Sequence, residues 1–137
     1  MDFKRSVGYL LHELSQQLTI ESDQVLLERF GIGFSQLKVL LALESSQGIP
    51  QKEIARVLCQ SEASVSRQIG VLIDKDLVEI GPSKDNRRHL IYLTSKGEEL
   101  CQRANAALNR HLAPYFEHLT DKQLINLSDM LRSIKLT

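Results

Sequence analysis

The sequence has no tryptophan, only two cysteines and three prolines, and aromatic residues make up 5% of its 137 positions. Two cysteines are too few for a disulfide framework, which favours a reducing, cytoplasmic compartment. No hydrophobic run approaches the ~18 residues that a membrane-spanning helix needs, and residues 1–5 do not read as the start of a signal peptide. We therefore expect no membrane association.

The formal net charge is zero, which argues against a surface that coats nucleic acid non-specifically. Positive charge is nevertheless concentrated in residues 84–96, where Asp85 is the only acidic residue beside Lys84, Arg87, Arg88 and Lys96. DNA binding depends on such local clustering rather than on net charge. This segment is therefore a candidate DNA contact.

The hydrophobic patterns at the two ends of the chain predict helices that pack partly against another chain. Hydrophobic residues recur at helical spacing from Phe3 to Leu27 before the glycines of the segment 31–33 end the pattern. A helix of about 25 residues is long for so small a domain. A capping-box pattern at residues 120–123 opens the last helix, whose leucines then follow at steps of three and four. We expect residues 2–30 and 105–137 to form the dimerisation helices of a homodimer.

The pattern of residues 35–100 predicts three helices followed by a β-hairpin, and the second and third helices are joined by a tight turn. Three helices are expected at 35–44, 50–58 and 62–75, with Pro50 in a first turn and Ser61 as an N-cap. Strands are expected at 77–80 and 89–93 around a turn-rich loop, followed by a helix to about Ala113. This order indicates a winged helix-turn-helix. The fold class is mainly α with a small β-hairpin wing (α+β), in a single domain over residues 1–137.

The segment 85–97 resembles the wing signature of the multiple antibiotic resistance regulator (MarR) family. It reads Asp-x-Arg from Asp85, then five residues, Leu-Thr, two residues and Gly97. Residues 51–55 and 61–67 resemble the two helices of the family's DNA-binding motif. Asp76 stands where the family usually has glycine, but Asp tolerates the left-handed conformation better than most residues. Ile80 stands near a position where the family often has arginine.

The resemblance implies a dimeric repressor that binds an inverted repeat in double-stranded DNA and is released by a small, often aromatic or phenolic, ligand. The family's ligand pocket lies between the dimerisation and DNA-binding regions. We interpret four residues as candidates for lining it, although they could equally belong to the core: Tyr9, His12, Phe34 and Leu37.

The candidate DNA contacts fall into two sets. The polar face of the helix at 62–75 includes side chains that bind bases or phosphates, and the alternative is a solvated surface: Ser61, Ser64, Ser66, Arg67 and Gln68. In the wing, Arg87 is a candidate for the minor groove, while Lys84 and Arg88 are candidates for phosphates. Arg87 could instead pair with Asp85 and hold the hairpin in shape.

The cysteines raise an alternative function, a redox-responsive regulator of the same fold. We expect Cys59 to be a small buried residue at the helix-turn-helix turn, and Cys101 to be the better redox candidate of the two. The four histidines show no close metal-ligand spacing, and no metal or cofactor is expected. No phosphate-binding glycine loop and no nucleophile with a partnered base are present, so we expect no enzyme. A protein-binding winged helix is disfavoured by the Arg87-Arg88 pair.

Overall fold

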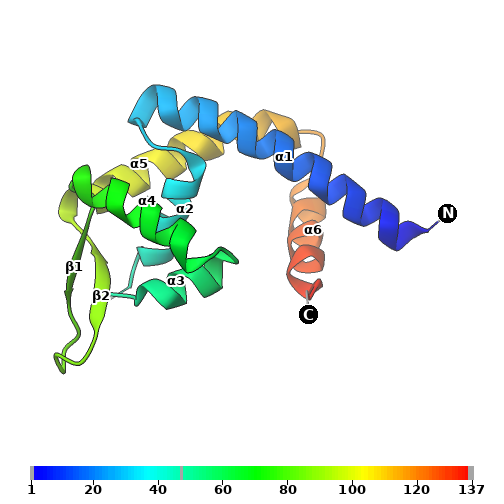
Figure 1. Ribbon diagram of the computed structural model, residues 1–137. Coiled ribbons are helices and arrows are strands. Elements are labelled where there is room, and N and C mark those ends of the chain that lie inside the picture. Colours follow the sequence, from blue (N-terminus) through cyan, green and yellow to red (C-terminus); the bar gives the residue numbers. More distant parts are fainter. Residues whose placement is uncertain (1, 47, 136–137) are drawn as a thin grey trace.

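The computed structural model describes residues 2–46 and 48–135 (Figure 1). Residues 1, 47, 136 and 137 lie outside the described residues. They belong to the predicted domain over 1–137, and residues 136 and 137 also belong to the predicted dimerisation segment 105–137. The elements follow the predicted order and confirm a mainly helical fold with one antiparallel hairpin: α1 Phe3–Phe30, α2 Phe34–Leu43, α3 Gln51–Leu58, α4 Glu62–Asp74, β1 Val78–Pro82, β2 His89–Leu93, α5 Ser95–Leu112, the 3-10 helix η1 Ala113–Phe116, and α6 Asp121–Ser133.

Helix α1 is long because both of its ends are capped and nothing interrupts it. The side chain of Asp2 accepts from the N–H of Arg5 at 3.4 Å. Gly31 adopts a left-handed conformation with φ 68°, and its N–H donates to the carbonyl of Leu27 at 3.2 Å. In this 28-residue helix only Ser22 and Leu26 are buried. Most of α1 therefore lies outside the core of its own chain.

The core is built around α2, which packs against α1, α3, α4, α5 and β2. Its fully buried side chains include Leu37, Val39 and Leu40. Two apolar residues of the neighbouring helices lie outside the core: Val57 of α3 is 53% exposed and Ile73 of α4 is 39% exposed. Each lies at the edge of its helix's buried stripe, because the 100° step of an α-helix turns it away from the interior.

The wing hairpin is tied to the connection between α2 and α3. Strands β1 and β2 pair antiparallel from Val78 opposite Leu93 to Pro82 opposite His89. Ile49 adds an isolated bridge to Ile91, with N···O distances of 3.0 and 2.8 Å. Residues 81–82, expected in the loop, are the end of β1. Proline is tolerated there because an edge position does not require its missing N–H.

Helices α5 and α6 both begin at a threonine whose side chain caps the helix. The hydroxyl of Thr94 accepts from the N–H of Gly97 at 2.9 Å and donates to the carbonyl of Asp76 at 2.7 Å. Asp76 has φ 60°, so the expected left-handed conformation is confirmed. Thr120 and Gln123 form the predicted reciprocal capping box of α6. No residue of α6 is buried.

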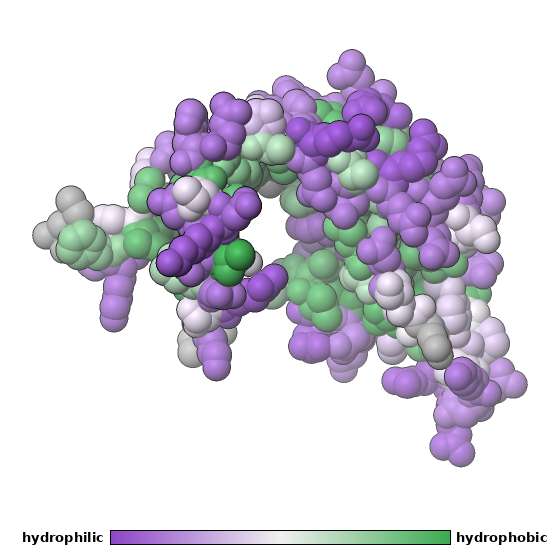
Figure 2. Space-filling model, turned by 180° about the vertical axis from the view of Figure 1, so that it is seen from behind, coloured by the Kyte–Doolittle hydropathy of each residue, from purple (hydrophilic) through white to green (hydrophobic). Residues whose placement is uncertain are grey.

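The N-terminal half of α1 and helix α6 extend away from the rest of the chain (Figure 1). Seen from behind, an opening separates this arm from the body, and hydrophobic surface lies beside it (Figure 2). The large hydrophobic side chains of α1 and α6 that are exposed are Phe3, Val7, Tyr9, Leu10, Leu14, Ile20, Leu27, Ile125, Met130 and Leu131. None of the described helices is both long and apolar enough to cross a membrane.

Candidate nucleic-acid interface

Helix α4 carries the first predicted set of contacts. Val65, Ile69 and Leu72 bury one face of this helix, which turns its polar positions outward. Ser66 and Arg67 are exposed, whereas Ser64 and Gln68 are half-buried. Ser61, the residue before the helix, is also exposed, so Ser61, Ser66 and Arg67 are the members of the set that are open to a ligand.

The start of α4 is organised by its own serines. Ser61 is the N-cap, and its side-chain oxygen accepts from the N–H of Ser64 at 3.1 Å. The hydroxyl of Ser64 donates to Oε1 of Gln60 at 3.3 Å. A capping serine stabilises the helix end, so these two residues hold the polar face in place in addition to any contact they make.

The turn between α3 and α4 corrects the expectation for Cys59. This residue caps α3 in a left-handed conformation with φ 53°, and its side chain is exposed. The left-handed residue reverses the chain at the end of α3, so its side chain points outward and does not fill the interior. The small buried residue is Cys101 instead.

Cys101 was expected to be the better redox candidate, and its environment contradicts this. Its side chain is fully buried, and Sγ lies 3.5 Å from Oε2 of Glu44. Burial and the nearby Glu44 carboxylate raise the pKa of the Cys101 thiol to about 12. Because the thiolate is the reactive form, Cys101 is chemically protected.

The wing loop is shaped by hydrogen bonds among its own residues. Oδ1 of Asp85 accepts from the hydroxyl of Ser83 at 2.5 Å and from the N–H of Arg87 at 3.1 Å. Oγ of Ser83 in turn accepts from the N–H of Arg88 at 3.1 Å. Asn86 turns the chain with φ 59°. The Ser83 hydroxyl, followed by the Arg87 N–H, lowers the pKa of Asp85 below its ordinary value.

This arrangement separates the two interpretations of Arg87. Nε of Arg87 lies 4.0 Å from Oδ2 of Asp85, and the Arg87 side chain is 85% exposed. An exposed ion pair at that distance contributes little. Asp85 thus shapes the hairpin through the backbone N–H of Arg87, while the guanidinium extends into solvent beside the exposed Lys84 and Arg88.

Sequence reasoning missed two residues on which the wing depends, Ser83 and Asn86. The composition of the segment 81–86 indicated a turn, but it did not indicate which side chains would bond. Ser and Asn commonly hydrogen-bond the backbone in turns or tolerate positive φ, so these residue types were the available signal. Within residues 2–46 and 48–135, no cluster of His, Cys, Asp or Glu could hold a metal ion.

The wing, α3 and α4 lie on one side of the molecule, below α1 and α5 in the view of Figure 1. The hairpin projects furthest from α1. The polar positions of α4 and the basic loop of the wing therefore belong to the same part of the fold, although Lys84 lies 16 positions after Gln68 in the sequence.

The four residues considered for an effector pocket are not brought together within one chain. Leu37 is fully buried in the core and Phe34 is half-buried against it, whereas Tyr9 is 68% exposed and His12 is also exposed. The N–H of Phe34 donates to Oδ1 of Asp23 at 2.7 Å, which fixes the start of α2 beside that part of α1. Tyr9 lies fourteen residues earlier on α1, about 20 Å along the helix axis.

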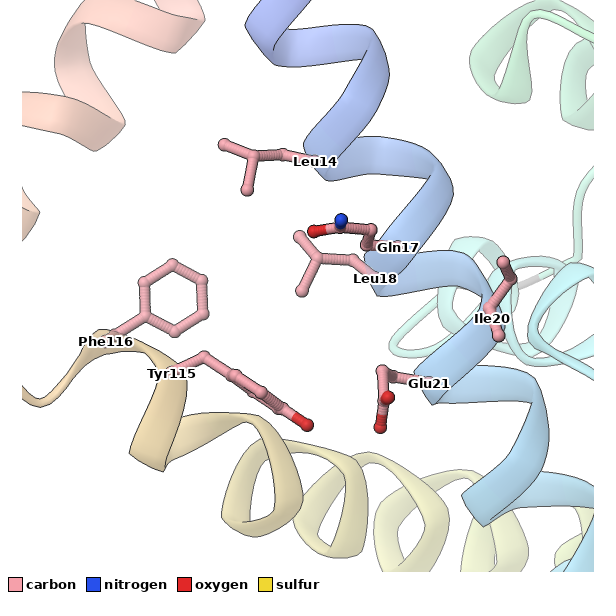
Figure 3. Close-up of a pocket in the computed structure, with 7 residues that line it drawn as sticks. All are labelled: Leu14, Gln17, Leu18, Ile20, Glu21, Tyr115 and Phe116. Atoms are coloured by element: carbon pink, nitrogen blue, oxygen red, sulfur yellow. The ribbon is translucent and has the colours of Figure 1, made fainter.

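A different pocket, of about 370 Å³, lies between α1 and η1 (Figure 3). The hydroxyl of Tyr115 points toward Glu21, and the interaction with this carboxylate is the largest cause that raises the pKa of Tyr115. Nε2 of His111 lies 3.2 Å from Oε2 of the same carboxylate. The remaining lining is mostly apolar: Leu14, Gln17, Leu18, Ile20 and Phe116.

The sequence is similar to those of known helix-turn-helix regulators. A family model described as the MarR family matches residues 30–89. An uncharacterized HTH-type transcriptional regulator, YhbI of Bacillus subtilis, is 30% identical over 112 residues, which cover 81% of this chain and 73% of the relative.

Solved structures of known proteins have the same fold. CouR from Rhodococcus jostii RHA1, bound to p-coumaroyl-CoA, matches with a TM-score of 0.83 and 23% identity over 93% of this chain and 89% of that one. A mutant MarR from E. coli complexed with operator DNA matches with a TM-score of 0.79 and 23% identity, over 93% and 91%. The winged helix-turn-helix, the wing pattern from Asp85 to Gly97 and these matches agree: the chain belongs to the MarR family of helix-turn-helix transcriptional regulators.

Proposed function

We propose that this protein is a sequence-specific regulator that binds double-stranded DNA as a homodimer at an inverted repeat and acts as a repressor. One observation carries the proposal: the exposed face of α4 and the basic wing loop lie on the same side of the molecule. Such a pair matches the grooves of a duplex, with a helix in the major groove and a flanking element on the backbone or minor groove. The complex of a structurally similar E. coli MarR with operator DNA supports it.

The two elements divide the recognition between them. Arg67 is exposed on α4 and can bond guanine bidentately, while Ser66 beside it can bond a base or a phosphate. In the wing, Lys84 and Arg88 supply phosphate contacts that do not depend on sequence. The side chain of Arg87 is exposed, so its guanidinium group can enter a narrow minor groove.

The homodimer is supported by the hydrophobic surface of α1 and α6. Leu10 and Leu14 are 54% and 53% exposed, and Met130 of α6 is 58% exposed. Large apolar side chains that gather on the exposed surface of two helices are typical of protein interfaces. A second copy placed against these helices would cover it, and the resulting two-fold symmetry would present two α4 helices to the two halves of an inverted repeat.

Release by a small ligand completes the proposal. The pocket of Figure 3 has apolar walls with the polar groups of Glu21 and Tyr115 at one side, which is the usual character of a small-molecule site. The p-coumaroyl-CoA bound to the structurally similar CouR supports a ligand-responsive regulator. The redox alternative has less support at Cys101, which is buried with a raised thiol pKa, and would depend on the exposed Cys59.

Selection of genomic DNA fragments by the protein, followed by an electrophoretic mobility shift, tests the proposal. The wild type should retain fragments that share an inverted repeat, and an Arg67→Ala, Arg87→Ala double variant should lose the preference for them. Arg132→Ala is the matched control, because Arg132 is 79% exposed on α6 and far from the wing. Retention of bulk DNA without enrichment, or equal binding by the double variant, would contradict the proposed function.

A further inference from the structure

A second hollow, of about 420 Å³, lies between the end of α1 and the middle of α5. Three of its six lining residues are arginines, and the others are one aromatic ring, one amide and one methyl group. The lining consists of Arg29, Phe30, Gln102, Arg103, Ala106 and Arg110. In a chain with zero net charge, three guanidinium groups around one hollow are a strong local concentration of positive charge.

Helical geometry places these arginines around the hollow. Arg103, Ala106 and Arg110 recur at steps of three and four on α5, so they lie on one face of that helix. Arg103 and Arg110 are two turns apart, about 10 Å along the axis. The small side chain of Ala106 leaves space between them. Arg29 approaches from the last turn of α1, which packs against α5.

Two of the three guanidinium groups are held by the same aromatic ring. Cζ of Arg29 lies 5.6 Å from the ring centroid of Phe30, and Cζ of Arg103 lies 5.8 Å from it. Cation–π contacts of this length orient the guanidinium without neutralising its charge. No carboxylate in the described part of the chain lies within 4.0 Å of Arg29, Arg103 or Arg110. Their hydrogen-bond donors therefore remain available.

We propose that this hollow binds a small molecule that carries two linked phosphate groups. Guanidinium groups bind phosphate oxygens bidentately, and three of them spread over two helical turns extend beyond the reach of a single phosphate. DNA is not the partner, because the end of α1 and the middle of α5, which line the hollow, lie on the side of the molecule away from the tip of the wing (Figure 1). Arg110 falls within the segment 105–137, but its face of α5 is charged, unlike the apolar surface proposed for the dimer.

Calorimetric titration of the full-length protein with inorganic pyrophosphate at low salt tests the site. We expect saturable binding of one pyrophosphate per chain. An Arg103→Gln, Arg110→Gln double variant should bind at least ten-fold more weakly. The matched control is Lys84→Gln, Arg88→Gln, which removes the same two charges from the wing and should leave the affinity for pyrophosphate unchanged. All four side chains are exposed, so both double variants should keep the wild-type melting temperature.

Two further measurements sharpen the assignment. Phe30→Leu should weaken pyrophosphate binding while all three arginines remain, because it removes the ring that orients them. Adenosine diphosphate distinguishes the source of the phosphates: equal affinity assigns the site to the diphosphate alone, and tighter binding assigns it to a nucleotide. Absence of saturable binding to the wild type, equal affinity for orthophosphate, or a loss confined to the wing variant would each overturn the proposal.

Discussion

Gly97 lies directly against the carbonyl oxygen of Leu77, so that a Cβ at position 97 would be only 1.9 Å from that oxygen. The cap of α5 creates this approach, because the N–H of Thr94 donates to the same carbonyl at 3.1 Å and the Thr94 hydroxyl accepts from Gly97. The glycine of the wing signature is therefore a packing requirement at the junction between the wing and α5.

Gly97→Ala should destabilise the protein by about 3 kcal/mol, the upper range for forcing an atom into a packed site, because a backbone carbonyl cannot rotate aside. Gly70→Ala is the matched control: its Cβ would meet no atom within 4 Å, and alanine in a helix interior gains roughly 0.5–1 kcal/mol over glycine. Urea unfolding at one fixed protein concentration measures both. Equal stabilities of the two variants would show that the junction can relax.

The wing arginines should differ in how their loss depends on salt and on sequence. Arg88→Ala removes a phosphate contact, so it should weaken binding to all DNA and lower the slope of log affinity against log salt by roughly one. Arg87→Ala should cost about 1–3 kcal/mol on sites with A·T-rich flanks and much less on G·C-rich flanks. Fluorescence anisotropy over a salt series measures this. Equal losses on both flanks would make Arg87 a phosphate contact only.

The ionised form of Asp85 should stabilise the conformation of the wing loop, because the carboxylate accepts hydrogen bonds from Ser83 and Arg87. Its folded-state pKa is lowered, so the stability that it contributes is present above the ordinary carboxyl pKa and is lost as pH falls through the lowered value. NMR titration of the Asp85 carboxyl measures that pKa. Ser83→Ala should raise it toward the ordinary value, because the Ser83 hydroxyl is the largest cause of the shift. An unchanged pKa in this variant would assign the shift to the backbone N–H of Arg87.

If the exposed apolar residues of α1 and α6 form the dimer interface, introducing charged residues there should disrupt the dimer. A Leu10→Glu, Leu131→Glu double variant should yield monomers or aggregates, because the carboxylates would lose hydration at an apolar interface. Ile80→Glu is the control, since Ile80 is 53% exposed but lies on the wing, away from α1 and α6. Light scattering measures the molar mass of each. A double variant that remains a dimer would place the interface elsewhere.

The two cysteines should react at very different rates. Cys59 is exposed and should react quickly with a thiol reagent, whereas Cys101 is buried with a pKa of about 12 and should stay protonated and slow at neutral pH. Because the folded state raises this pKa from 9.0, the contribution of Cys101 to stability should fall as pH rises above about 9. Mass spectrometry after timed labelling gives the two rates, and rapid labelling of Cys101 in the folded protein would contradict its burial.

We expect no redox control of DNA binding. The wild type and a Cys59→Ser, Cys101→Ser double variant should bind DNA equally before and after mild peroxide treatment. If peroxide released DNA from the wild type but not from the double variant, the regulator would be redox-responsive, with the exposed Cys59 as the reactive thiol.

The order of the elements could be predicted from the sequence because the signals that set it are local. Ser61 and Thr120 cap their helices through bonds to residues three positions away, and Gly31 ends α1 through its own φ. The wing turn likewise depends on contacts within residues 83–88. Each of these interactions spans fewer than six residues, so residue types at short spacing were sufficient to predict the helix caps and the position of the wing turn, but not which side chains of that turn would bond.

Tertiary structure alone decided which side chains are buried and which distant residues meet. Cys59 and Cys101 exchanged their expected environments, because burial depends on how α2 packs against α5 and on the direction in which a left-handed cap turns the chain. Tyr9 and Phe34 were separated by the length of an uninterrupted α1. Arg29 and Arg103 came together on Phe30 through the packing of α1 on α5. Such contacts join segments tens of residues apart, and neither periodicity nor capping patterns encode their geometry.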